Sequence, residues 1–450
     1  MHDVVRDMAI IGIGPEFGYM IKAGMNLVEL PDEHGWVKDP KKLSLMENNI
    51  LKVLDLSNTT IETLPNSISK LENISALRLQ HCRKLKYLPS LANLRGLKKL
   101  DLHEVGIEVV PQGMGMLISL EYLDLLFCQN LKEIPTRILS NLSNLQYLAV
   151  CCLRETTIIG NLEEVARLKK LETLECQFDG IQDFNHFVNK FKDFLSAIAY
   201  SLGVGTTRDM VRWSKYELVI TKCEIGEECV VLPNNLEDLW IFSGKNMRSI
   251  LKKTALLINA NELRPCRIWE SEEIECVVEL DSSSFSSLCC SALDKLELLE
   301  LQVLPKLCEL VRVEGATTPP HIFSNLKTLI IVHCLGMRKL LPLELLLAFR
   351  NLEEIRVIHC EQMEEIIASS DSNASSDKFT FPKLRILRLI GLSILAQLPL
   401  LDNGQLSPPP HLKEIKIDEE SKEWWELVEW DHPNAKNLLK PFLKYSDWWD

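Results

Sequence analysis

The chain has 450 residues, of which 46% are hydrophobic and 25% are charged, and its formal net charge is −13. These proportions are typical of globular proteins, and the length would allow about three ordinary domains. The acidic balance argues against a nucleic-acid-binding protein, because neutralising phosphates requires clustered lysines and arginines. No run of about 18 apolar residues occurs, so no membrane-spanning helix is expected.

The N-terminus does not have the pattern of a secretory signal. Asp3 and Asp7 occupy the place of a basic region, and the apolar stretch that follows is short. Fourteen cysteines without such a signal predict reduced thiols in a cytoplasmic protein.

A repeat begins near residue 51. The pattern Leu-x-x-Leu-x-Leu starts at Leu51, Ile74, Leu97 and Leu120, which gives an interval of 23 residues each time. Each unit closes with an aliphatic residue and a proline: Leu64-Pro65, Leu88-Pro89, Val110-Pro111 and Ile134-Pro135. This period and pattern indicate leucine-rich repeats, in which each unit supplies one short strand and stacked units bury the leucines. The predicted fold is therefore an α/β leucine-rich-repeat solenoid, with a curved parallel β-sheet on the concave face and irregular or short helical segments on the convex side.

The later repeats are less regular. We place their first apolar anchors at Leu145, Leu171, Leu236, Leu263, Leu296, Leu326, Leu352, Leu384 and Leu412. Between Leu171 and Leu236 the best guesses for two further units are Leu195/Ile198 and Tyr216/Val219. Loop insertions rich in Ser, Gly, Pro or Asp are expected at 282–287, 315–320, 369–377 and 402–410.

Residues that flank the anchors should face the open side of the sheet. The row that follows the third anchor is mostly polar in the N-terminal half and apolar in the C-terminal half. A contiguous apolar strip on a sheet suggests a surface that binds a partner. The candidate partner-binding residues are Trp240, Phe242, Trp269, Ile330, Val332, Ile358 and Ile390. The alternatives are that a loop or the C-terminal cap covers this strip, or that the registers assigned to the irregular repeats are wrong.

Several local motifs match a known family. They are Met1-His2-Asp3, Leu43-Ser44-Leu45-Met46, Leu51-Lys52-Val53-Leu54-Asp55-Leu56-Ser57, and the tail Trp424-Trp425-Glu426-Leu427 with Trp430-Asp431. With the repeats, they resemble plant intracellular nucleotide-binding leucine-rich-repeat disease resistance proteins of the coiled-coil, non-TIR class. The resemblance implies that His2 matches the family's nucleotide-sensing motif at the end of the winged-helix part. The nucleotide-binding domain and its phosphate-binding loop do not occur in this sequence.

The resemblance suggests five segments. Residues 1–47 would be a winged-helix remnant and connector, 48–160 regular repeats, 161–235 irregular repeats, 236–420 C-terminal repeats with insertions, and 421–450 a Trp-rich cap. Full members of the family usually hold about one more repeat between Ile50 and Leu51.

Two chemical motifs have simpler explanations. Gly12, Gly14 and Gly18 resemble a dinucleotide-binding fingerprint, but Pro15 stands where the helix of that motif should begin. His-Cys pairs at 81–82, 333–334 and 359–360 invite a zinc site, yet a small buried cysteine after the strand explains them better. No cofactor, metal site or catalytic residue is therefore predicted.

The sequence predicts a non-enzymatic recognition module. The family resemblance implies plant defence: binding a pathogen effector or a guarded host protein, and regulating a nucleotide-binding domain in cis or in trans. One alternative is part of an ADP/ATP-dependent immune switch, if the natural chain is longer. The other is a repeat scaffold or adaptor protein. Nucleic acid is not expected as a partner, and no membrane span is expected.

Overall fold

A computed structural model describes most of the repeat region. The described residues are 19–23, 42–46, 52–152, 163–205, 215–223, 230–244, 249–252, 262–281, 293–314, 322–341, 349–367, 381–392, 395, 408–419, 421–428 and 434–445. Two compact units divide the chain: Met1–Asp179 with Asp193–Gly203, and Gly180–Lys192 with Val204–Asp450. No helix among the described residues is both long and apolar enough to cross a membrane.

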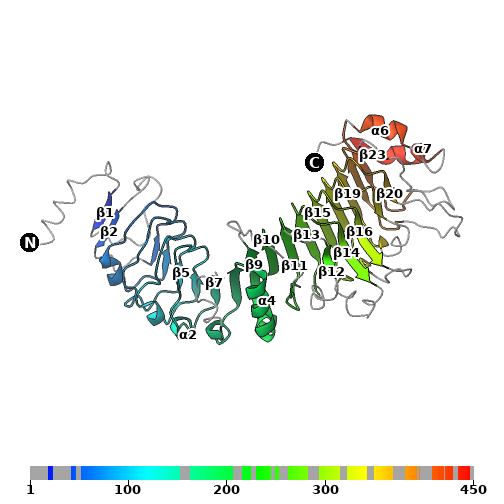
Figure 1. The fold of residues 1–450 in the computed structure, drawn as a ribbon. Helices are drawn as coiled ribbons and strands as arrows, with labels where there is room; N and C mark the ends of the chain where they lie inside the picture. Colours follow the sequence, from blue (N-terminus) through cyan, green and yellow to red (C-terminus); the bar gives the residue numbers. More distant parts are fainter. Residues whose placement is uncertain are drawn as a thin grey trace, which may run out of the picture. The chain divides into compact units, whose positions relative to one another are not determined.

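The first unit is built on parallel strands that follow one another in chain order (Figure 1). They are β3 (Val53–Asp55), β4 (Ala76–Arg78), β5 (Lys99–Asp101), β6 (Tyr122–Asp124), β7 (Tyr147–Cys152), β8 (Thr173–Phe178) and most of β9 (Ala199–Gly205). Leu54, Leu77, Leu100 and Leu123 pair in one register and are fully buried. The predicted solenoid, with one strand per repeat, is confirmed.

The second unit continues the same plan with longer strands. Its main sheet holds β10 (Tyr216–Thr221), β11 (Asp238–Phe242), β13 (Pro265–Trp269), β15 (Leu298–Gln302), β17 (Thr328–Val332), β19 (Glu354–Ile358), β21 (Ile386–Ile390), β22 (Glu414–Ile417) and β23 (Leu443–Tyr445). All the pairings recorded from β10 to β23 are parallel.

Part of the second unit forms additional sheets where irregular or helical segments were expected. One consists of β12 (Ser249–Lys252), β14 (Cys276–Asp281) and β16 (Glu309–Glu314), and another of β18 (Lys339–Leu341) and β20 (Glu365–Ile367) (Figure 1). Val277, Val278, Val311 and Val313 supply β-branched side chains, which favour extended backbone. The first unit instead uses short helical turns, η3 (Asn66–Lys70), η4 (Met114–Met116) and α2 (Ile138–Asn141), each placed soon after a repeat's proline.

The two guessed repeats between Leu171 and Leu236 have the wrong register. The Ala199 amide bonds to the carbonyl of Glu172, just as the Thr173 amide bonds to Gln146, so Tyr200 takes the second anchor position rather than Ile198. In β10, Leu218 and Ile220 align with Leu239 and Ile241, which moves Val219 to the opposite face. Two helices, α4 (Ile181–Lys190) and α5 (Lys192–Ala197), lengthen this stretch and hide its period. A slip of one residue reverses the face of every side chain in a strand.

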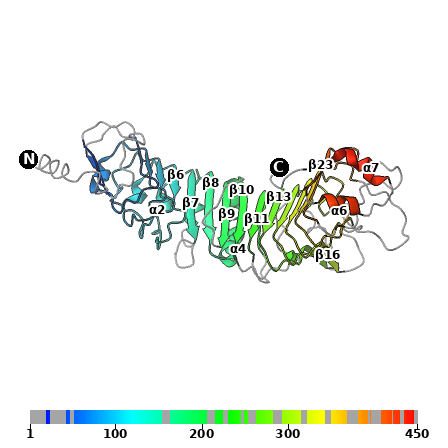
Figure 2. The ribbon, with the colours of Figure 1, turned by 90° about the horizontal axis from the view of Figure 1, so that it is seen from above.

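The ends of the chain are partly described. Near the N-terminus, β1 (Tyr19–Ala23) pairs with β2 (Lys42–Met46) in a separate parallel sheet. The C-terminal segment folds into α6 (Lys422–Leu427) and α7 (Ala435–Leu439), and its β23 then pairs with β22 (Figure 2). The buried Trp425 lies on α6. His2, the Gly12–Gly18 motif and the predicted insertions lie outside the described residues, except for positions 408–410.

Left-handed backbone recurs just beyond the strands. Ten non-glycine residues with positive φ occupy this place: Asn58, His81, Glu104, Phe127, Lys222, Ser243, Glu270, Val303, His333 and His359. Such a conformation costs an L-residue about 1–2 kcal/mol. Except for that of Phe127, which donates to Cys151 Sγ, the amides of these residues extend the backbone ladder to the next repeat, as in the 2.8 Å bond from Val303 N to Val332 O. The ladder offsets the local strain.

Adjacent isoleucines of β17 offer a direct test of the core. Ile331 is fully buried, whereas Ile330 is only partly buried on the other face. Ile331→Ala should lower the free energy of unfolding by about 2–5 kcal/mol through lost burial and a cavity. Ile330→Ala should cost about 1 kcal/mol, because less apolar area is lost. Denaturant unfolding of both variants measures the difference; equal losses would contradict the assigned faces.

Val303 offers a test of the backbone strain. It is β-branched, 44% exposed and held at φ 54°. Asparagine tolerates this conformation better, so Val303→Asn should raise the free energy of unfolding by about 0.5–1 kcal/mol. Val109 is also exposed, at 53%, but is not among the positive-φ residues. Val109→Asn is therefore the matched control and should bring no gain in denaturant unfolding.

Candidate functional site

The predicted binding residues lie where the sequence placed them on the main sheet of the second unit. Phe242 pairs with Trp269, and Val332 pairs with Ile358, which pairs with Ile390. Trp240 and Ile330 lie two residues earlier on β11 and β17, in the next row of the same face. The alternation of the strands puts the buried anchors on the opposite face.

The aromatic residues form one cluster, which we call the aromatic cluster: Trp240, Phe242 and Trp269. The rings of Trp240 and Phe242 stack with centroids 5.7 Å apart, and Trp269 meets them edge-on at 5.4 and 5.1 Å. These distances are those of favourable aromatic pairs. Trp240 is buried, whereas Phe242 and Trp269 keep part of their surface exposed. The cluster is thus a packed apolar platform with two accessible members.

An arginine side chain packs against one side of the aromatic cluster. The Arg267 guanidinium lies 4.4 Å from the centre of the Trp240 ring, a distance at which a cation and a π face attract each other. Its NH1 group is 2.8 Å from Asp238 Oδ1, and its Nε is 3.5 Å from Glu300 Oε2. Burial raises the pKa of Asp238, and the Arg267 charge opposes that rise. The platform is therefore bordered by charges that are already paired.

The aliphatic members form a second group, but they are not an exposed strip. Val332 and Ile358 are each 7% exposed and Ile390 is 1% exposed, and these three side chains pack together with the partly buried Ile330. The polar Glu300 and Gln302 of β15 separate this group from the aromatic cluster. The strip is therefore not a continuous accessible face: only Phe242, Trp269 and Ile330 of the seven residues are partly accessible.

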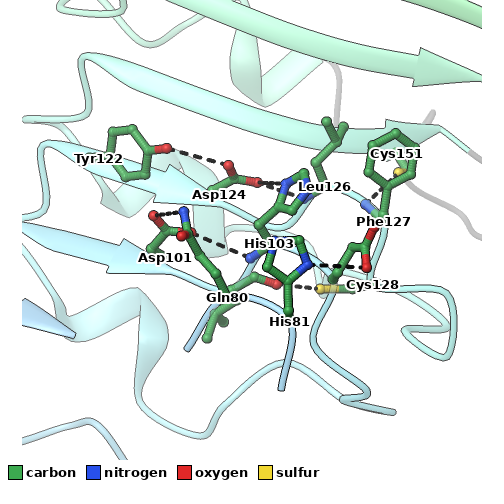
Figure 3. Close-up of polar contacts among 12 residues, drawn as sticks. Gln80, His81, Asp101, His103, Tyr122, Asp124, Leu126, Phe127, Cys128 and Cys151 are labelled. Atoms are coloured by element: carbon green, nitrogen blue, oxygen red, sulfur yellow. Dashed lines mark hydrogen bonds and ion pairs between the residues drawn. The ribbon is translucent and has the colours of Figure 1, made fainter. Parts of the chain in front are cut away.

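The first unit holds a polar cluster that the sequence did not predict (Figure 3). Asp101 and Asp124 are 0% and 2% exposed, although both lie on the face opposite the leucine anchors. Gln80 Nε2 donates to Asp101 at 2.7 Å, and the Leu126 amide donates to Asp124 at 2.9 Å. We call Asp101, His103 and Asp124, with the groups bonded to them, the aspartate cluster. The sequence did contain a signal for this cluster, because Asp55, Asp101 and Asp124 recur at the same place in their repeats.

The recurring cysteines serve the interior of the repeats. Cys82 Sγ donates to the carbonyl oxygen of Leu56 at 3.1 Å, and Cys128 Sγ donates to that of Leu102 at 3.0 Å. Cys334 and Cys360 are likewise buried and donate to carbonyls of the preceding repeat. In these four repeats the thiol links the turn after the strand to a backbone carbonyl of the preceding repeat.

The zinc alternative lacks a suitable geometry. His333 is exposed, while the adjacent Cys334 points its thiol toward a buried carbonyl. The rings of His333 and His359 stack on each other with centroids 5.0 Å apart. No group of three or more potential metal ligands occurs among the described residues.

Comparison with known proteins gives a consistent relationship. Residues 309–422 match the family model of plant disease resistance protein RPS2-like leucine-rich repeats. Disease resistance protein At4g27190 of Arabidopsis thaliana is 27% identical over 433 residues, which cover 87% of this chain. Putative disease resistance protein At4g19050 of the same plant is 25% identical over 428 residues and 82% of this chain. Over most of its length the chain is therefore similar in sequence to plant disease resistance proteins.

The chain matches only part of those longer proteins. Its alignments cover 42% of At4g27190 and 35% of At4g19050. Among solved structures, the Leptospira interrogans leucine-rich-repeat protein LIC12759 aligns with 92% of the chain and 95% of its own length, with 18% identity and a TM-score of 0.42. A Listeria monocytogenes internalin aligns with 72% of the chain and 77% of its own length, with 16% identity and a TM-score of 0.39.

Thiol reactivity should separate the cysteine positions. Cys308 is exposed, whereas Cys128, Cys334 and Cys360 are buried. Burial raises the pKa of Cys360 to about 11 and raises those of Cys128 and Cys334 further. Since the thiolate is the reactive form, iodoacetamide should label Cys308 quickly in the folded protein and the other three only after unfolding.

Peptide mass spectrometry over a labelling time course measures these rates. Labelling in guanidinium is the control, and there all four cysteines should react without prior reduction. Native labelling of Cys334 as fast as that of Cys308 would contradict the burial of the repeat cysteines.

Proposed function

We propose that the chain acts as the recognition module of a plant disease resistance receptor, by binding a pathogen effector or a host protein that such an effector modifies. The observation that carries this proposal is the aromatic cluster on the main sheet of the second unit. Trp and Arg are the residue types that most often dominate interface energies. Here Trp269 and Phe242 present partly exposed rings on a platform held rigid by Arg267. The proposed activity is therefore binding, without catalysis.

The aromatic cluster has the physical properties of a binding centre. Its rings are fixed by one another, so binding a partner would immobilise few additional side chains, which lowers the entropic cost of association. The charges around it already form pairs. A partner therefore need not leave an unpaired charge buried, which would weaken an interface.

The wider role of the receptor is also part of this proposal. The relatives At4g27190 and At4g19050 are much longer than the aligned segment. We propose that binding at the repeats regulates a nucleotide-binding domain, carried in cis in a longer chain or supplied in trans, in the cytoplasm. His2, which matches the nucleotide-sensing motif, would belong to that domain rather than to the repeats.

Removal of the accessible rings tests the binding site. Proximity labelling in plant tissue would first identify a partner, whose affinity for the purified chain is then measured by calorimetry. The double variant Phe242→Ala/Trp269→Ala should weaken binding at least 30-fold, because the loss of even one central aromatic residue costs about 2 kcal/mol or more. Tyr87→Ala is the control: Tyr87 is an exposed aromatic residue of the first unit, and its loss should leave the affinity unchanged.

Thermal unfolding of the same samples separates lost binding from lost structure. A double variant that folds and binds the partner with unchanged affinity would exclude the aromatic cluster as the binding site.

A further inference from the structure

The aspartate cluster brings two buried carboxylates together. Asp101 on β5 and Asp124 on β6 are partners in the parallel register, and neighbouring strands lie about 4.8 Å apart. Like charges opposite each other in a sheet are destabilising, and burial makes each uncompensated charge more costly. Nearby cations must therefore balance this pair.

Two cations reach these carboxylates. Lys99 Nζ is 3.3 Å from Asp101 Oδ2, and its ammonium also lies 3.8 Å from the centre of the Tyr122 ring. His103 Nδ1 is 3.6 Å from Asp124 Oδ1. The other groups on Asp124 are neutral donors, the Leu126 amide and the Tyr122 hydroxyl. Histidine is the side chain type whose charge ordinarily changes near neutral pH, and His103 is the histidine of this set.

The remaining groups around His103 do not replace its charge. Its ring meets those of His81 and Phe127 edge-on, both at 5.5 Å. Glu104, the next residue, is bound by Arg83 at 2.5 Å and by His81 at 3.2 Å. Although burial acts to raise the pKa of Glu104, these hydrogen bonds hold it below its usual value.

The cation on the neighbouring strand β4 is already paired with another carboxylate. Arg78 on β4 lies 3.3 Å from Asp55 on β3. Around Asp124, therefore, the described structure provides no second cation that compensates for the loss of the His103 charge.

We propose that the aspartate cluster is a pH-responsive device of the first unit, in which protonated His103 neutralises buried Asp124 and deprotonation loosens the segment 101–127. Below the pH at which His103 loses its proton, the two carboxylates face two cations. Above it, one buried carboxylate keeps only neutral donors. Asp124 accepts a hydrogen bond from the Leu126 amide, and the following residue, Phe127, has positive φ. Loss of the His103 charge would therefore weaken a contact that stabilises a strained turn.

The direction of the effect follows from proton linkage. Burial by itself lowers the pKa of His103, but its hydrogen bond to Asp124 and the surrounding carboxylates raise it above its usual value. A raised histidine pKa adds stability that is complete below about pH 6.5, the value in unfolded chains, and is lost as pH rises through the folded pKa.

Asp101 acts in the same direction. Burial first, and then the charge of Asp124, raise the pKa of Asp101. Ionisation of Asp101 therefore costs more in the folded than in the unfolded chain, and its contribution to stability falls as pH rises through its folded pKa.

Histidine-detected NMR of the full chain, labelled with 13C at the histidine rings, tests the proposal directly. The His103 resonance should titrate with a midpoint above pH 6.5. Asp124→Asn keeps an acceptor for the Leu126 amide but removes the charge, so it should shift that midpoint downward and also assign the resonance. A midpoint at or below 6.5 in the unmodified protein would overturn the proposal, and so would a midpoint that Asp124→Asn does not move.

Thermal unfolding between pH 6 and 8.5 provides the second readout. The unfolding temperature of the first unit should fall as pH rises, and His103→Gln, which cannot titrate, should flatten that dependence. His411→Gln is the matched control, since His411 is exposed and belongs to the second unit. A pH dependence that persists unchanged in His103→Gln would refute the role of His103; the NMR titration decides the matter if that variant does not fold.

Discussion

No single repeat of this protein can bury its own leucines, and the rest of the structure depends on that constraint. A three-residue strand such as Val53–Asp55 has almost no interior of its own. Its anchor becomes fully buried only because the next strand presents Leu77 at the same height. Stability therefore comes from the interfaces between neighbouring repeats, as in other stacked-repeat proteins. Every repeat must keep the same backbone path for its anchor to meet the next one.

This constraint explains why the structure accepts local strain. At the end of each strand the chain must turn away from the sheet while its amide still reaches the next repeat. Glu104, Phe127 and Val303 adopt positive φ at this place, although their side chains do not favour it. The buried cysteines serve the same turn, because their thiols give a further donor to carbonyl oxygens of the preceding repeat.

Since the anchors fix one face of the sheet, the other face is free to carry different chemistry in each unit. In the first unit it holds acidic and neutral polar groups arranged around His103. In the second unit it holds the aromatic cluster and a separate aliphatic group. In both units this face is more buried than the open face of a sheet would be, since Asp124 and Ile390 are almost inaccessible. The side chains pack against their neighbours within each row, so even this face has a structured interior.

The sequence by itself determined the repeat, its period and the register of most strands, because a core of leucines at fixed spacing allows only one alignment of neighbouring strands. It also determined that Phe242 and Trp269, like Val332, Ile358 and Ile390, share a row. Only the tertiary structure decided the register between Leu171 and Leu236, where α4 and α5 interrupt the period. It likewise decided which row members are buried, and it brought His103 against Asp124. The contact between His103 and Asp124 joins neighbouring repeats, whose strands lie about 23 residues apart in the chain. The local sequence pattern does not show how close such side chains come in space.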